Sequence, residues 1–336
     1  RARLRRRTRG HDDRSSGGGL IMARPEPELV RYEGPIVDAH HHLWDLGLGK
    51  HPWIVPEPES EMVFGDPTPL YRNYLPADLE KDAAGLDLVA SVHIEAGWDR
   101  SDPVGETEWL ASLKRESRLP TVAVVFAPLD DPGVGGMLEA HCRHDFVRGV
   151  RFILSWHEDP TNRFVERADY MTDRQWCEGF ALLREFGLSF DLMLYPGQLD
   201  QAAGLADRFP ETTIIVNHAG SPVDRDPAGM AAWRRGLKRL AERPNVWLKI
   251  SDLVAYDHDW TFASLRPVVL DCIEAFGTER AMFASDFPVA GLHAGYVEMY
   301  DVFATITADL TEADQRRLFA ENSRQAYRID KLSHQS

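Results

Sequence analysis

Short runs of apolar, β-rich residues alternate with amphipathic stretches from about residue 35 onward. The apolar runs predict eight strands: Ile36–His40, Leu88–Glu95, Thr121–Ala127, Gly149–Leu154, Leu188–Leu194, Thr213–His218, Val246–Ser251 and Ala281–Asp286. Several of these runs are almost continuously apolar, which is typical of strands that are buried on both faces of a parallel sheet. The pattern therefore predicts an α/β protein.

Apolar positions at three-to-four spacing predict helices between and after these strands. The predicted helices are Asp173–Phe186, Leu199–Arg208, Met230–Ala241, Phe262–Phe276 and, with Thr311 as its N-cap, Glu312–Tyr327. Eight strands joined by helical crossovers favour a closed (β/α)₈ TIM barrel over an open sheet. No glycine-rich phosphate motif follows the first strand, which disfavours dinucleotide binding. The Trp- and Pro-rich segment 43–86 predicts a loop insertion over the C-terminal face of the barrel, beside the substrate pocket.

Composition narrows the classes of partner. The 336 residues are 43% hydrophobic, which allows a large core, and the formal charge of −15 argues against nucleic acid and acidic membranes as partners. No apolar run is long enough to span a membrane. Cys142, Cys177 and Cys272 follow no metal-ligand spacing, so we expect free thiols and a cytoplasmic location. A homo-oligomer is compatible with these features.

Residues 1–24 differ in composition from the rest of the chain. They are rich in arginine and then in glycine, and no apolar segment follows as it would in a secretory signal. We expect a disordered or non-native extension, with Met22 as the natural start, followed by one barrel domain over residues 25–336. A DNA-contacting arm is the alternative interpretation.

A His-x-His pair closes the first predicted strand. Residues two apart on a strand point to the same side, so His40 and His42 should both face the barrel interior and His41 should face away. Their place at the carboxyl end of the strand is where active sites of such barrels form. Two neutral imidazoles at this position suit a divalent ion or a polarised carbonyl oxygen. A histidine-rich turn is the alternative.

Two further polar residues close apolar strands. His218 ends the sixth predicted strand and Asp286 ends the eighth, and both are costly to bury without partners. Alone, His218 could be a hydrogen-bonded core histidine and Asp286 a helix N-cap. Together with His40 and His42 they predict an active site.

Other residues near strand ends are candidates for the same site. Glu95 could complete a set of metal ligands or orient a ligand histidine. Arg151 and Lys249 could hold a substrate carboxylate or lactone oxygen, or form structural ion pairs. We also predict substrate contacts for three aromatic residues, of which the last two could instead cap their loop: Trp44, Trp156 and His157.

Several spaced motifs resemble the amidohydrolase superfamily, in the branch that contains sugar lactonases and 2-pyrone-4,6-dicarboxylate lactonase. The resemblance covers about residues 35–329 and rests on six segments: Asp38–Asp45, Arg148–Arg151, Val216–Pro222, Asn245–Ser251, Met282–Val289 and Glu321–Arg328. It implies that Asp286 is the general base for a hydrolytic water. It also implies that His40, His42 and His218, with Asp286, bind a metal or polarise the carbonyl directly.

The chain departs from the two-metal pattern of that superfamily. The fourth strand has no lysine for a bridging carbamate, and Lys249 stands on the seventh strand where a further histidine could have stood. We therefore expect one divalent ion, with Zn²⁺ favoured, or none. No Gly-x-Ser-x-Gly nucleophile motif is present.

The function that these features predict is hydrolysis of a small sugar- or muconolactone-type lactone. In this hypothesis water activated by Asp286 attacks a carbonyl that the histidines polarise. The partner is then a small-molecule substrate. Within the superfamily the alternatives are a Zn²⁺-dependent non-oxidative decarboxylase and an amide hydrolase. From another class, the alternative is a barrel that binds a small molecule without turnover.

Overall fold

Eight parallel strands form the frame of the fold. The computed structural model describes residues 27–57 and 62–329, so the predicted extension at residues 1–24 lies outside the described part. Within it the strands pair in chain order, each parallel to the next. They are β1 Pro35–His41, β2 Asp87–Ile94, β3 Val122–Phe126, β4 Val147–Ile153, β5 Ser189–Met193, β6 Ile214–Val216, β7 Val246–Ile250 and β8 Ala281–Phe283. All eight predicted strands are confirmed, with shifted bounds.

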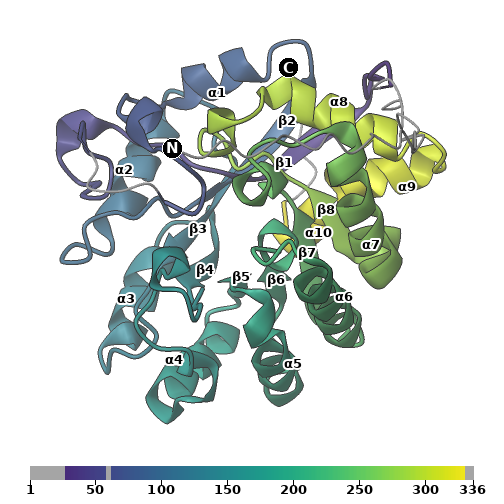
Figure 1. Cartoon of the computed structure of the whole chain (residues 1–336). Helices are drawn as coiled ribbons and strands as arrows, with labels where there is room; N and C mark the ends of the chain where they lie inside the picture. Colours follow the sequence, from purple (N-terminus) through teal and green to yellow (C-terminus); the bar gives the residue numbers. More distant parts are fainter. Residues whose placement is uncertain (1–26, 58–61, 330–336) are drawn as a thin grey trace, which may run out of the picture.

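Helices surround the strands on the outside, as Figure 1 shows. In the described residues the α-helices are α1 Pro76–Asp82, α2 Gly105–Leu113, α3 Val134–Cys142, α4 Arg174–Glu185, α5 Leu199–Arg208, α6 Pro227–Ala241, α7 Phe262–Arg280, α8 Tyr296–Ile306, α9 Glu312–Arg316 and α10 Asn322–Ala326. The predicted (β/α)₈ barrel is thereby confirmed. Helix α6 begins earlier than predicted because Asp226 caps it and Pro227 occupies its first position. The predicted last helix contains a π-helical turn between α9 and α10.

The barrel closes through backbone hydrogen bonds of residues from the predicted site. The His42 N–H donates to the Phe287 carbonyl, and the Asp286 N–H donates to the His40 carbonyl, each at 2.8 Å. These bonds join the end of β1 to the residues that follow β8. The histidine pair and the aspartate are therefore neighbours because the barrel closes between them.

A β-bulge sets the direction of the histidine pair. In the β1–β2 ladder, Ala39 and His40 together oppose the single residue Val92. Ala39 belongs to the inner apolar cluster of the barrel, and the alternation of side chains restarts at His40. As predicted, His40 and His42 share one side, while His41 turns to the other side against β2.

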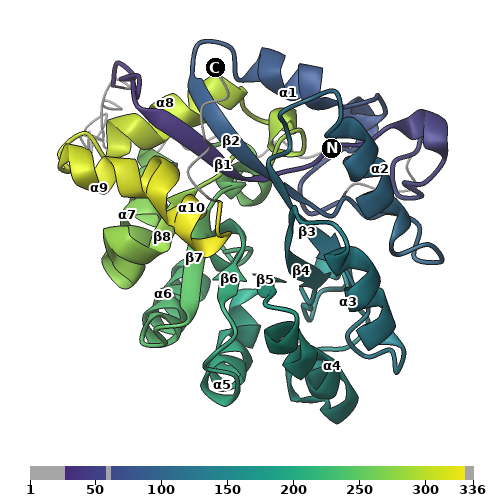
Figure 2. The ribbon, with the colours of Figure 1, turned by 180° about the vertical axis from the view of Figure 1, so that it is seen from behind.

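The core has two parts. A large outer cluster packs the strands against the helices. A smaller inner cluster joins strand residues such as Val37, Ile215 and Met282 to Tyr327 and Ile329 from the end of the described chain. Figure 2 shows α10 across the strands on that side of the barrel. The C-terminal segment thus covers one end of the barrel and leaves the other end for the site.

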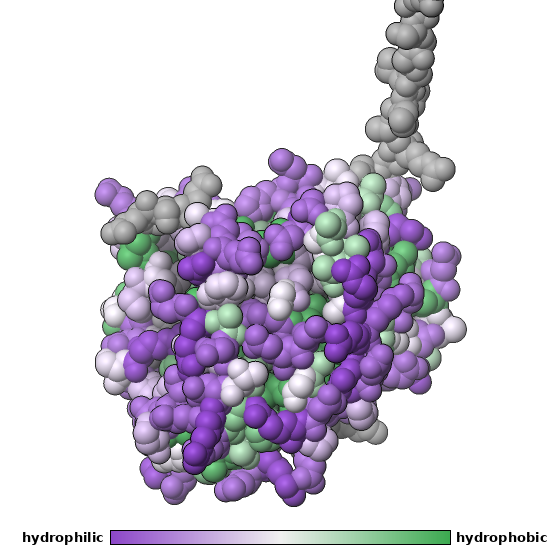
Figure 3. All heavy atoms as spheres, turned by 60° about the horizontal axis from the view of Figure 1, so that its bottom comes forward, coloured by the Kyte–Doolittle hydropathy of each residue, from purple (hydrophilic) through white to green (hydrophobic). Residues whose placement is uncertain are grey.

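The surface is predominantly polar. Hydrophilic side chains cover most of the face in Figure 3, with apolar residues scattered among them. None of the helices in residues 27–57 and 62–329 has both the length and the apolarity needed to cross a membrane. The three cysteines are free, as expected.

Candidate active site

Three imidazoles converge on one carboxylate oxygen. The Nε2 atoms of His40, His42 and His218 lie 3.0, 3.3 and 3.8 Å from Oδ1 of Asp286. All four side chains are buried. His40 and His42 come from the end of β1, while His218 and Asp286 follow β6 and β8. The structure thus brings together the four residues on which the sequence hypothesis depends.

Unusual backbone conformations aim these side chains. His218 has a φ of 52° and Asp286 a φ of 58°, both in the left-handed region that non-glycine residues rarely adopt. Asp252, which follows β7, has a φ of 49°. Such strain persists only where surrounding packing enforces it, and it concentrates at functional sites. The turns after β6, β7 and β8 all direct polar side chains to the same point.

The hydrogen bond that His42 makes through Nδ1 leaves its other ring nitrogen as an acceptor that faces an acceptor oxygen of Asp286. Its Nδ1 lies 2.8 Å from the carbonyl oxygen of Ile94, which can only accept, so Nδ1 carries the hydrogen. In the neutral ring, Nε2 then presents a lone pair to Asp286 Oδ1, an oxygen that has no hydrogen-bond partner among the described residues. A positively charged species between these two atoms would satisfy both.

The donor set suits a divalent metal ion. Ligand atoms of His40, His218 and Asp286 all lie within 4.8 Å of one another, and His42 Nε2 faces the same carboxylate oxygen. Imidazole nitrogens with one carboxylate oxygen are common ligands of Zn²⁺, which takes about four of them. The residues present therefore fit one such ion.

His40 has a different environment from His42. Lys249 Nζ lies 3.3 Å from His40 Nδ1 and 2.6 Å from Asp191 Oδ1. Because His40 Nε2 faces Asp286, Lys249 contacts the other nitrogen of the ring. Lys249 is fully buried in the barrel interior. It contacts Nδ1 of the His40 ring from inside the barrel and does not line the cavity.

Burial controls the charges of these groups. It lowers the pKa of His218 to about 4 and, together with the charge of Lys249, the pKa of His40 well below its usual value. These two imidazoles are therefore neutral near pH 7, as metal coordination requires. Burial also raises the pKa of Asp252 well above normal, and the charge of Asp286 adds to this effect. For Asp286, burial is outweighed by the neighbouring His218 and His40, which hold its pKa well below normal.

Glu95 and Arg151 form a buried ion pair beside the histidines. Arg151 Nε donates to Glu95 Oε1 at 2.8 Å, and the Gly97 N–H donates to Glu95 Oε2 at 3.0 Å. Both oxygens of Glu95 are thus engaged. Arg151 Nη1 lies 3.5 Å from His40 Nε2. The geometry suits Glu95 as the residue that orients Arg151, and Arg151 as a donor near the reaction centre.

A cavity of about 410 Å³ opens above Asp286. His42, Arg151, His218, Asp252 and Asp286 contribute to its lining. The predicted insertion between β1 and β2 also contributes, through residues such as Trp53 and Phe64. This confirms that the insertion forms part of the cavity wall over the C-terminal face of the barrel.

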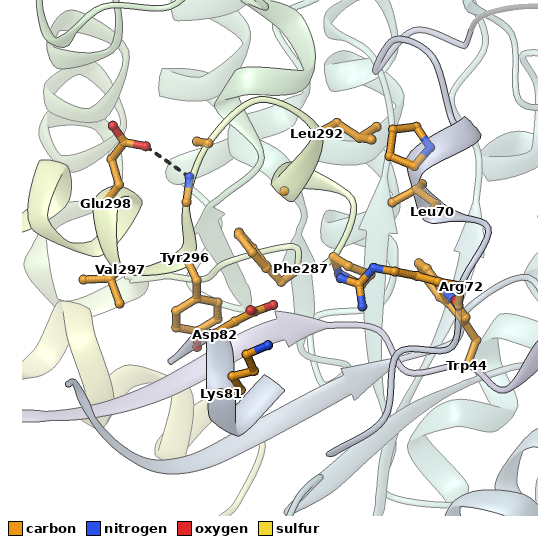
Figure 4. Close-up of a pocket in the computed structure, with 15 residues that line it drawn as sticks. Trp44, Leu70, Arg72, Lys81, Asp82, Phe287, Leu292, Tyr296, Val297 and Glu298 are labelled. Carbon is orange, nitrogen blue, oxygen red and sulfur yellow. Dashed lines mark hydrogen bonds between the residues drawn. The ribbon is translucent and has the colours of Figure 1, made fainter. Parts of the chain in front are cut away.

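Three predicted substrate contacts lie elsewhere. Trp44 is fully buried and donates its indole N–H to the Arg72 carbonyl. It borders a separate groove between the segment after β1 and the segment after β8, which Figure 4 shows. Trp156 and His157 do not line the cavity of Asp286 either. His157 Nε2 lies 3.3 Å from Asp224. The order of residues along the chain does not reveal these directions, because they depend on how each loop folds back.

Two polar groups of the site were not predicted from the sequence. Asp252 lies two residues after the end of β7 and lines the cavity beside Asp286. Its position one residue beyond a predicted strand end was the available signal. Asp191 lies inside β5 and accepts hydrogen bonds from Lys249, Asn217 and Tyr327. An aspartate within an apolar strand is also costly unless partnered, which was the signal for this buried network.

Comparisons with known proteins agree on one family. The family model described as amidohydrolase matches residues 37–329. An uncharacterised protein of Sinorhizobium fredii is 37% identical over 88% of this chain and 98% of its own length. An L-fucono-1,5-lactonase of Burkholderia multivorans is 30% identical over 78% of this chain and 85% of its own length. A crystal structure of an amidohydrolase from Burkholderia multivorans with bound zinc has a TM-score of 0.74 at 25% identity. It covers 88% of this chain and 99% of that one.

Proposed function

Since this chain belongs to the amidohydrolase family, we propose that it is a lactonase, a hydrolase that opens a small cyclic ester with water. The observation that carries the proposal is the convergence of three imidazole nitrogens on Asp286 Oδ1 at the floor of a cavity. A carboxylate held in this way is deprotonated, so it can act as a base. The similarity to an L-fucono-1,5-lactonase supports a cyclic ester as the substrate.

Asp286 is the general base in this proposal. Its carboxylate takes a proton from water as the water oxygen bonds to the lactone carbonyl carbon. The resulting tetrahedral intermediate collapses with cleavage of the ring C–O bond. Asp286 then gives its proton to the departing alkoxide oxygen, so the product is a hydroxy acid and the base is regenerated.

The surrounding donors stabilise the charge that develops on the carbonyl oxygen. Arg151 Nη1, 3.5 Å from His40 Nε2, is a fixed donor at this place. His218 Nε2 is 3.8 Å from Asp286 Oδ1, and the turn after β6 holds its ring in place. Because these donors are fixed before substrate arrives, they need little reorganisation during the reaction.

His40, His42, His218 and Asp286 would hold a divalent ion when one is present. A bound Zn²⁺ would supply Lewis acidity toward the carbonyl and lower the pKa of water. In this proposal Glu95 orients Arg151 and does not bind the ion, because both of its oxygens already accept hydrogen bonds. Trp44, Trp156, His157 and Lys249 do not line the cavity, so the proposal gives them no direct contact with substrate. Homo-oligomerisation and a cytoplasmic location stay predictions.

The test is a hydrolysis screen with a matched pair of variants. Purified protein, with and without added Zn²⁺, is assayed with a pH indicator against sugar lactones and muconolactone-type lactones. We expect Asp286→Asn to lower kcat roughly 10³-fold on any lactone that the wild type opens, with an unchanged melting temperature or a higher one. The exposed Asp224, which the catalytic steps do not use, supplies the control Asp224→Asn. A folded wild type that opens none of these lactones would count decisively against the proposal.

A further inference from the structure

The cavity walls are apolar away from the reaction centre. They come from five different segments of the barrel mouth, and among the described lining residues large apolar side chains predominate, notably Trp53, Phe64, Trp98, Phe152, Phe164 and Met193. The polar side chains of the lining are the reaction-centre groups described above and two arginines. The part of a substrate that does not react would therefore lie against hydrocarbon and aromatic rings.

Such walls are poorly matched to a polyhydroxylated ring. A hydroxyl group that leaves water for an apolar wall without a hydrogen-bond partner loses roughly tenfold to a hundredfold in affinity. A sugar lactone carries several such hydroxyls around its ring. A lactone with a hydrocarbon or aromatic body would instead gain from burial against the same residues.

The two arginines of the lining differ in their pairing. Arg151 is engaged by Glu95. Arg100, in the loop after β2, has no carboxylate within 4.0 Å among residues 27–57 and 62–329, and its side chain is exposed. Its guanidinium carbon lies 3.6 Å from the centre of the Phe126 ring. Stacking on this ring holds the guanidinium plane while leaving its edges free to donate hydrogen bonds.

We propose that the natural substrate is a lactone with an apolar body and a carboxylate remote from the ester, and that Arg100 binds this carboxylate. The inference rests on the proposed lactonase function and names the substrate class of that site. The apolar walls hold the body, the group around Asp286 receives the ester, and Arg100 selects the anion at the cavity rim. A planar, charged guanidinium is well suited to bidentate carboxylate binding.

The experiment compares three six-membered lactones. These are D-glucono-1,5-lactone, 3,4-dihydrocoumarin and a dihydrocoumarin that carries a carboxylate on its aromatic ring. We expect kcat/KM to rise at least tenfold from the sugar lactone to dihydrocoumarin, and further for the carboxylated compound. Spontaneous hydrolysis, measured without enzyme, is subtracted in each case.

Arg100→Gln tests the anion site. We expect the preference for the carboxylated over the neutral dihydrocoumarin to fall about tenfold, mainly through KM, with partial recovery in Arg100→Lys. Arg72→Gln is the control, because Arg72 also stacks on an aromatic ring, Tyr74 at 5.1 Å, but does not line this cavity. It should leave the preference unchanged.

The outcomes separate the inference from the function on which it rests. If the sugar lactone is the best substrate, or if Arg100→Gln and Arg72→Gln have the same preference as wild type, the substrate class is wrong while lactonase activity stands. If the folded wild type opens none of the three lactones, nor any in the broader screen, the proposed function itself is wrong.

Discussion

The Nε2 atom of His42 lies 3.3 Å from Oδ1 of Asp286, while Nδ1 of the same ring is bound to the carbonyl of Ile94. The carbonyl fixes the hydrogen on Nδ1, so the neutral ring and the carboxylate present lone pairs to each other. A positive charge between the two atoms would satisfy both lone pairs. Hydrogen bonds from the ring nitrogen that does not face the metal orient metal-binding histidines in proteins.

Zinc should therefore stabilise the protein through His42. With free Zn²⁺ at about 100 times its Kd, we expect the free energy of unfolding to rise by about 2.7 kcal/mol. His42→Asn should weaken zinc binding at least tenfold, measured by competition with a chelating dye. His144→Asn changes a histidine that belongs neither to the ligand group nor to the cavity lining, and it is the control. Equal zinc affinity in wild type and His42→Asn would refute this role for His42.

The Lys249–Asp191 pair should be important for stability. Both side chains are fully buried, and the Nζ–Oδ1 distance is 2.6 Å. Lys249→Met leaves the carboxylate of Asp191 without its cation, so we expect a loss of about 3–5 kcal/mol in urea unfolding. Adding Asp191→Asn removes the stranded charge and keeps an acceptor for Tyr327, so the double variant should recover part of the loss. If the loss in free energy of unfolding of the double variant equalled the sum of the losses of the two single variants, the residues would not act as a pair.

Glu106 should make stability depend on pH. Burial, reinforced by the charge of Glu95, raises the pKa of Glu106 from 4.5 to about 7. A raised pKa in the folded state means that its contribution is fully present below pH 4.5 and is lost as pH rises through 7. The predicted loss is roughly 3 kcal/mol over that window.

Glu106→Gln should lack this loss. Relative to wild type, the variant should gain stability between pH 5 and pH 8, measured by denaturant unfolding at each pH. Glu108→Gln changes an exposed residue of the same helix and serves as the control. A constant difference between Glu106→Gln and wild type over this range would contradict the pKa assignment.

Gly97 allows Trp53 to form the cavity wall. Gly97 has a φ of +69°, and a Cβ there would lie 2.6 Å from Trp53 Nε1, which donates to the Ala96 carbonyl at 2.7 Å. We expect Gly97→Ala to destabilise the protein by about 1–3 kcal/mol and to raise KM more than it lowers kcat.

Gly49→Ala separates the cost of backbone strain from the cost of a steric clash between the added Cβ and a neighbouring side chain. Gly49 has a φ of +63°, and no atom of residues 27–57 and 62–329 lies within 4 Å of its added Cβ. This variant should show the cost of the left-handed backbone alone, about 1 kcal/mol, and an unchanged KM. If both alanine variants had the same KM, Trp53 would not shape the substrate cavity.

The amino-acid sequence by itself determined the barrel and the centre of its site. Strand alternation is a local property, and eight apolar runs with helical crossovers leave few ways to bury both faces of a parallel sheet. His40, His218 and Asp286 were found because polar residues at the ends of apolar strands meet at one end of such a barrel.

Only the tertiary structure decided which other residues join that centre. The bulge at Ala39 and His40 depends on pairing with β2. Lys249 supports His40 from behind, and Trp44 borders another groove, because packing between distant segments sets their directions. Arg100 reaches the cavity through a loop whose course no periodicity encodes. Local patterns thus fixed the elements, while contacts between segments far apart in the chain selected the residues around the reaction centre.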